Sequence, residues 1–173
     1  MPFEPWQPGM IITEERLASI SPEWQDWTPT WTTSTGVNTP SFGNASILAR
    51  YAQAADVVFF RLEIAFGSST NFGGGGGSDN WRFSLPVAAA GTQLIAGDGE
   101  AQDSATGGTP SSLRVPLRAR LTGPTTLELE TSGGATGYAG GYAATPSGLI
   151  DAVTPFTWAN GDFIRVAGEY EAA

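Results

Sequence analysis

The chain has 173 residues and a mass of 18.0 kDa, and its 17 acidic and eight basic residues give a net charge of −9. It has no Cys and no His, and all eight basic residues are Arg. A disulfide framework, a thiolate metal site and the usual histidine or lysine catalysts are therefore excluded. An acidic chain without a basic stripe is not expected to bind nucleic acid.

The length predicts one domain plus an arm, and the composition predicts its fold class. The 23 Gly and 12 Pro residues, with only 14% charged residues, favour an all-β protein with many turns. The apolar runs are too short for a membrane span, and the N-terminus lacks the pattern of a signal peptide. We expect a chain made in the cytosol, with no membrane partner and no cofactor.

The first predicted element is a short helix near the N-terminus. Thr13 offers a capping hydroxyl, Glu14 and Glu15 suit the positive end of a helix, and Pro22 ends the pattern. The surrounding arm, residues 1–26, is too apolar for a free tail and too short to fold alone. We therefore expect it to dock on another protein. The residues expected to make this contact are Phe3, Trp6, Met10, Ile11, Ile12, Leu17, Ile20 and Trp24.

Three tryptophans follow within eight positions, in the stretch PEWQDWTPTWTTST. Trp27 and Trp31 are an even number of residues apart, so an extended strand places both on one face with Pro29. We expect this pair to close the core and Trp24 to pack at the seam between the arm and a partner. The alternative is a sugar-binding platform formed by the three rings.

The strands expected further along the chain are short and mostly alternate between apolar and polar residues. They span residues 27–32, 45–53, 59–66, 81–85, 93–96, 113–121, 127–130, 156–158 and 164–170. Together they predict a jelly-roll-like antiparallel β-sandwich over residues 27–173, with another Greek-key sandwich as the alternative.

Two of these strands also predict a register. If Leu113–Leu121 and Leu127–Glu130 form an antiparallel hairpin with both apolar faces inward, opposed residue numbers must add to an even sum. A loop of residues 123–125 then sets Arg120 opposite Glu128 and Arg118 opposite Glu130.

Long linkers rich in small residues separate the strands, at residues 68–80, 97–112 and 131–148. Such loops usually carry function or become ordered against a neighbour. Tyr138 and Tyr142, set among glycines in the last linker, are candidates for an interface or for sugar stacking.

No strong metal or phosphate motif is present. Asp98, Glu100 and Asp103 offer oxygen ligands in a predicted loop, but without the spacing of an EF-hand they are only weak candidates for Ca²⁺. The glycine run at residues 73–77 lacks the Lys of a P-loop and predicts a hairpin tip.

Catalysis could rest only on carboxylates, hydroxyls or Arg. Paired acids can hydrolyse glycosidic bonds. The acids considered for this role are Glu63, Glu128, Glu130, Asp151 and Asp162. We expect them instead on polar strand faces and in turns, with Asp162 capping the turn that Asn160 and Gly161 begin. The sequence therefore predicts a protein that is not an enzyme.

Three stretches together resemble a module of bacteriophage virion proteins. They are DWTPTWTTSTGVNTPSFGNASILARYAQAADVVFFRLEIAFGSST, NWRFSLPVAA and VTPFTWANGDFIRVAGEYEAA, and their order over residues 27–173 carries the resemblance. The leader PWQPGMIITEERLASI is similar to that of many phage tail proteins. Such modules are minor tail or tail-fibre proteins of phages that infect GC-rich Gram-positive bacteria.

The resemblance implies a β-sandwich displayed on a virion, assembled in the host cytoplasm as a homotrimer and held to tail or baseplate proteins by its arm. It implies no catalytic residues. Host-surface glycans are a possible further contact. Two alternatives stay open: a capsid decoration protein bound to the major capsid protein, and a carbohydrate-binding module without a role in a particle. A glycan-degrading enzyme ranks after both.

Overall fold

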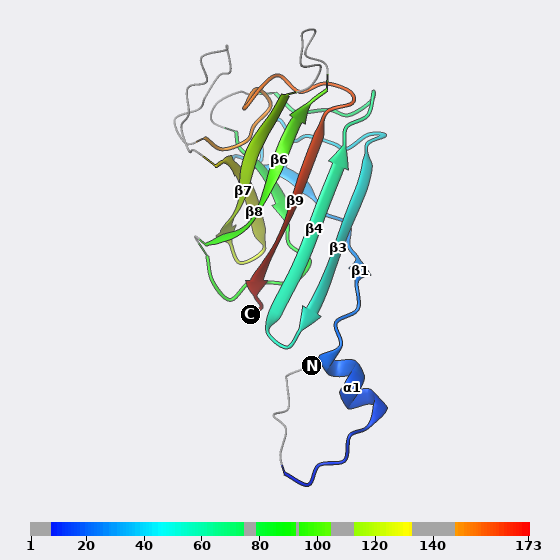
Figure 1. The fold of residues 1–173 in the computed structure, drawn as a ribbon. Helices are drawn as coiled ribbons and strands as arrows, with labels where there is room; N and C mark the ends of the chain where they lie inside the picture. Colours follow the sequence, from blue (N-terminus) through cyan, green and yellow to red (C-terminus); the bar gives the residue numbers. More distant parts are fainter. Residues whose placement is uncertain (1–7, 75–78, 93, 105–112, 133–147) are drawn as a thin grey trace.

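A computed structural model of the chain describes residues 8–74, 79–92, 94–104, 113–132 and 148–173. The expectation of an all-β fold is confirmed, because its described elements are nine strands and one short helix (Figure 1). The elements are α1 (Glu14–Ile20), β1 (Gln25–Asp26), β2 (Trp31–Thr33), β3 (Ser46–Ala54), β4 (Val57–Ala65), β5 (Trp81–Ser84), β6 (Ile95–Asp103), β7 (Leu113–Gly123), β8 (Thr126–Thr131) and β9 (Phe163–Glu171).

The nine strands belong to one antiparallel sheet in the order β1-β3-β4-β9-β6-β7-β8-β5-β2. The sheet curls so that the regions near its two edges face each other across the core. The ring of Trp31, on β2, lies 5.6 Å from that of Phe66, which follows β4 near the opposite end of the sheet. A sandwich-like core thus forms without a break between two sheets.

The segment Gln25–Thr33 supplies the strand at each edge of this sheet. At its start β1 pairs with β3, and at its end β2 pairs with β5. Between them the Trp27 amide donates to the Ala49 carbonyl at 3.0 Å, and the Ser84 amide donates to the Thr30 carbonyl at 3.0 Å. The sequence predicted one strand from 27 to 32, whereas the structure splits it because Pro29, buried between β1 and β2, has no amide to donate.

The prediction for this segment's tryptophans is confirmed for two of the three. Trp31 and Pro29 are buried and Trp27 is half-buried, while Thr28, Thr30 and Thr32 between and beside them are exposed. Trp31 enters a cluster of rings at one end of the core. The other rings of this cluster are Phe42, Phe66, Phe72, Trp81, Phe83, Phe156 and Trp158.

The predicted hairpin register is confirmed. Arg118 lies opposite Glu130 and Arg120 opposite Glu128. The turn is tighter than expected, because a bulge after Leu121 lets Gly123 pair with Thr126.

One further strand prediction is wrong, and another has the wrong bounds. Residues 156–158 form no strand, because the turn at residues 152–153 runs on into a bend at residues 155–156. The strand expected at 93–96 instead runs as β6 from Ile95 to Asp103, through most of the first half of a predicted linker. Its glycines Gly97 and Gly99 hide the alternation that would have predicted a strand there.

The strand directions give the molecule two different ends (Figure 1). The turns after β3 and β7, the segment before β6 and the C-terminus lie at one end, beside which α1 stands. The C-terminal ends of β2, β4, β6 and β8 lie at the opposite end. The arm therefore leaves one end of the sheet, and β2, β4, β6 and β8 finish at the other.

Candidate docking arm and surface clusters

The arm places exposed apolar side chains outside the sheet. Thr13 caps α1 as predicted, because its Oγ1 accepts from the Arg16 amide at 3.3 Å. Ile11, Ile12 and Leu17 are 80%, 60% and 51% exposed. Figure 1 shows α1 beyond the turn between β3 and β4, away from the sheet. Isolated exposed apolar residues are ordinary, but three within seven positions of a short arm suit a contact surface.

The arm is joined to the sheet through Trp24. The Arg50 Nη2 donates to the Trp24 carbonyl at 2.7 Å, and the Arg61 guanidinium lies 4.7 Å from the centre of the Trp24 ring. Arg50 also forms an ion pair with Asp26 at 2.9 Å. Trp24 is 41% exposed, so it lies against the outside of β3 and β4 and fixes where the arm leaves the sheet. The sheet begins at Gln25, two residues earlier than expected.

Several predicted site residues lie outside the described residues. Phe3 and Trp6 precede residue 8, and Tyr138 and Tyr142 belong to the undescribed segment 133–147. Ile20 ends α1, but its side chain is not described. Met10 is half-buried, unlike the two isoleucines that follow it.

The weak metal candidates do not form a metal site. Asp98, Glu100 and Asp103 lie on β6, and alternation along a strand turns Asp103 to the face opposite the other two. Glu100 instead accepts from Arg165 at 2.9 Å and pairs with Arg114 at 3.6 Å. Among the described residues no group of three acidic side chains is placed to hold a metal ion. The prediction of a loop at these positions was wrong because β6 extends across them.

Two acids considered for catalysis are buried in an ion-pair ladder across β7, β8 and β5. Glu130 is 2% exposed and accepts from Arg118 and, at 3.0 Å, from Arg120. Glu128 is 3% exposed and accepts from Arg82 at 2.5 Å. Hydrogen-bonded Arg partners offset the cost of removing these carboxylates from water. The ladder holds three strands together on the outer side of the sheet.

The other three acids also have structural partners. Glu63 pairs with Arg165 at 3.4 Å, and the Asp151 Oδ1 accepts from the Val153 amide at 2.8 Å. Asp162 is fully buried and accepts from the Ser104 and Ala159 amides at 2.8 and 2.7 Å. Burial raises the pKa of Asp162 above its usual value, against the effect of these hydrogen bonds. Its predicted role in the turn is confirmed, and the contact with Ser104 also ties that turn to the end of β6.

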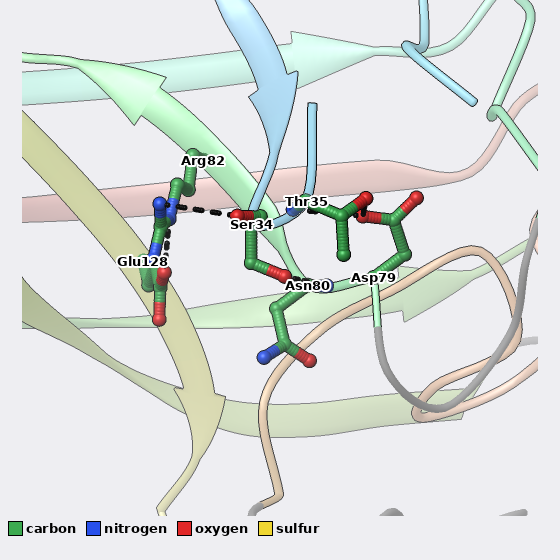
Figure 2. Close-up of polar contacts among 6 residues, drawn as sticks. All are labelled: Ser34, Thr35, Asp79, Asn80, Arg82 and Glu128. Atoms are coloured by element: carbon green, nitrogen blue, oxygen red, sulfur yellow. Dashed lines mark hydrogen bonds and ion pairs between the residues drawn. The ribbon is translucent and has the colours of Figure 1, made fainter. Parts of the chain in front are cut away.

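A polar cluster that the sequence did not predict lies at the end of β2 (Figure 2). The Ser34 amide donates to the Asn80 carbonyl at 2.8 Å, and the Asn80 amide donates to the Ser34 Oγ at 3.1 Å. The Thr35 hydroxyl and amide both donate to the Asp79 Oδ1, at 2.6 and 3.2 Å. Figure 2 shows Arg82 reaching both Glu128 and the Ser34 carbonyl. The cluster fastens the end of β2 to the start of β5, and only residue types common in turns marked it in the sequence.

Asp79 is a buried carboxylate, 6% exposed, that is kept ionised. Burial alone would raise its pKa, but hydrogen bonds from Thr35, Thr33 and Asn38 together outweigh burial and hold the pKa of Asp79 below its usual value. A lowered folded-state pKa means that Asp79 adds stability above its unfolded pKa of about 3.9. This contribution is lost as the pH falls through the folded pKa.

We expect Asp79→Asn to lower the free energy of unfolding at pH 7 by about 1 to 2 kcal/mol, because a hydrogen bond to a charged acceptor becomes one to a neutral group. The difference from the unchanged chain should shrink as the pH is lowered from about 5 to 3. Urea unfolding across this range measures it. A difference that stays constant with pH would show that the Asp79 charge contributes nothing.

Comparison with protein-family models finds no match for this chain, and comparisons with curated proteins and with solved structures find none either. In the described part of the chain, α1 is too short to cross a membrane. The function must therefore be argued from the arm, the sheet and the polar clusters.

Proposed function

We propose that the chain is a non-enzymatic structural protein of a phage particle, a tail or tail-fibre protein anchored by its N-terminal arm. The observation that carries the proposal is the arm itself. Ile11 and Ile12, just before α1, and Leu17, on α1, are exposed, and α1 itself lies beyond the end of the sheet (Figure 1). Burying two isoleucines against a partner stabilises a contact by about 3 kcal/mol or more.

The arrangement of the two ends supports the same role. The arm leaves one end of the sheet, while β2, β4, β6 and β8 finish at the other (Figure 1). A protein held to a particle by one end and displayed from the other needs this separation. The sequence resemblance to phage virion modules points to the same class. A capsid decoration protein, anchored to the head by the same arm, is the alternative within this class.

The described surface gives less support to a separate carbohydrate-binding module. Sugar-binding modules present flat aromatic rings to their ligands. Among the described large apolar residues that are exposed, Trp24 is the one aromatic, and Arg61 lies over its ring. The acids considered for glycan hydrolysis are held by Arg or by backbone amides.

The proposal is tested on particles purified from a culture whose phage encodes this chain. We expect an antibody against the chain to label the tail of every particle in electron micrographs. Substituting Ile11→Glu and Ile12→Glu together should reduce the amount incorporated by about tenfold or more, since a loss of 1.4 kcal/mol already gives this factor.

Val37→Glu is the matched control, because Val37 is also exposed, at 61%, but lies just after the end of β2, where the Thr33 hydroxyl donates to its carbonyl. Its incorporation should not change. Label on the head would favour the decoration protein, and particles without the chain would refute both roles.

A further inference from the structure

The turn before β9, at residues 159–162, contains the one Asn-Gly pair of the sequence, Asn160 and Gly161. Gly161 has a φ of 89°, a conformation that glycine adopts without strain. The Asp162 amide donates to the Ala159 carbonyl at 3.3 Å and closes the turn. Asn160 is exposed, and in the described part of the chain no hydrogen bond or ion pair holds its side chain.

An asparagine followed by glycine can react with its own backbone, and asparagine is among the residue types that degrade on heating. The glycine amide first loses its proton to hydroxide, and its nitrogen attacks the asparagine Cγ. The bond from Cγ to the side-chain nitrogen breaks, and that nitrogen takes a proton from water and leaves as ammonia, which restores the hydroxide. A cyclic imide remains. Glycine favours this step because it has no Cβ to obstruct the approach.

Water then opens the imide at one of its two carbonyl carbons. Attack at Cγ gives an ordinary aspartyl residue. Attack at the main-chain carbonyl carbon gives an isoaspartyl residue, in which the main chain runs through Cβ and Cγ. Both products add a negative charge, and the second also lengthens the main chain by a carbon atom.

The fold holds the amide that would react. The Gly161 amide donates to the Phe66 carbonyl at 2.9 Å, and the Phe66 amide donates to the Asp162 carbonyl at 2.9 Å. The Asp162 carboxylate accepts from the Ala159 and Ser104 amides at 2.7 and 2.8 Å. The proton that ring closure must remove is therefore hydrogen-bonded, in a turn fixed to the segments that follow β4 and β6.

We propose that Asn160 is a site of spontaneous deamidation and that the contact between the Gly161 amide and the Phe66 carbonyl controls its rate. Reaction requires an opening that frees this amide, so the rate follows the fraction of molecules in which the turn is open. The isoaspartyl product changes the spacing between Ala159 and Asp162 on which the hydrogen bonds of the turn depend. The inference concerns the chain itself and does not rest on its role in a particle.

The test compares the purified full chain, folded in buffer and unfolded in urea, during incubation at mildly alkaline pH. Mass spectrometry of peptides, with aspartyl and isoaspartyl forms separated, measures conversion at Asn160. We expect conversion in the folded chain to be slower by about tenfold or more, because the hydrogen-bonded turn must open first. Asn160→Gln should abolish the new acidic form.

Hydrogen exchange of the Gly161 amide gives an independent measurement. Exchange and ring closure both begin with loss of the same proton. The fold should therefore slow both by a similar factor, relative to the chain in urea.

Asp162→Asn loosens the turn without touching the reacting pair. An amide side chain has one acceptor oxygen in place of two, so either the Ala159 or the Ser104 amide loses its partner. Deamidation of the folded variant at Asn160 should be faster by about threefold or more. Asp56→Asn is the matched control, because Asp56 is exposed in the turn between β3 and β4. It should leave the rate unchanged, and near-ultraviolet circular dichroism should show that both variants keep the fold.

Equal rates in the folded and unfolded chain would overturn the inference, as would an unfolded chain that stays unmodified at Asn160. A Gly161 amide that exchanges as fast in the folded chain as in urea, or a folded Asp162→Asn variant with an unchanged rate, would also contradict it.

Discussion

Replacing Trp31 with alanine is expected to lower the free energy of unfolding by about 3 to 4 kcal/mol, the cost of removing a large aromatic side chain from a packed core. Trp31 is 5% exposed, and its ring centre lies 4.7 Å from that of Trp81 and 5.1 Å from that of Phe42. Its ring packs against rings that lie near both edges of the curled sheet. Its indole nitrogen has no hydrogen-bond partner in the described structure, which keeps the expected loss below the top of the usual range.

Trp24→Ala is the matched control, since it removes the same side chain seven residues earlier. Trp24 is 41% exposed, and its ring contact is the one with Arg61. A cation–π contact at an exposed site is worth about 0.5 to 1 kcal/mol, so the loss should not exceed about 1 kcal/mol. Urea unfolding of both variants measures the difference. Equal losses would show that Trp31 does not hold the core as described.

Gly99→Ala is expected to destabilise the protein by about 3 kcal/mol, at the upper end of the usual cost of overpacking. A Cβ at Gly99 would lie 2.0 Å from the Arg165 carbonyl oxygen and 2.8 Å from the Val166 Cα, both in the backbone of β9. Because β9 pairs with β4 on its other side, its backbone cannot move away without straining that pairing as well.

Gly74→Ala provides the control for this change. A Cβ at Gly74 meets nothing within 4 Å, so its cost should stay within about 0.5 kcal/mol. Thermal and urea unfolding should rank the two variants clearly. If Gly99→Ala unfolds like Gly74→Ala, β6 and β9 do not approach as closely as described.

The alternating parts of the sequence predicted the fold well. In the hairpin of β7 and β8, apolar residues at every second position allowed only an even register, and this fixed the partners of Arg118 and Arg120. The same alternation predicted β4 and β9 to within two residues at each end. Where one face of a strand is buried and the other is polar, the alternation of apolar and polar residues predicts both the strand and its register.

The alternation of apolar and polar residues failed to predict a strand where backbone atoms, rather than side chains, make the contact between strands. Gly97 and Gly99 lack a side chain because β9 lies against them, so β6 resembled a loop in the sequence. The cluster around Asp79 was not predictable for another reason. Its hydrogen bonds join residues 44 to 46 positions apart through common turn-forming types, and only the fold brings them together.

The segment that carries Trp27 and Trp31 has a consequence for how the protein opens. An uncovered sheet edge offers unpaired amides and carbonyls to other chains. Here the stretch from Gln25 to Thr33 covers part of both edges, on β3 and on β5. Local opening of this stretch would uncover both edges together, so protection of its amides against hydrogen exchange reports on the closure of the whole sheet.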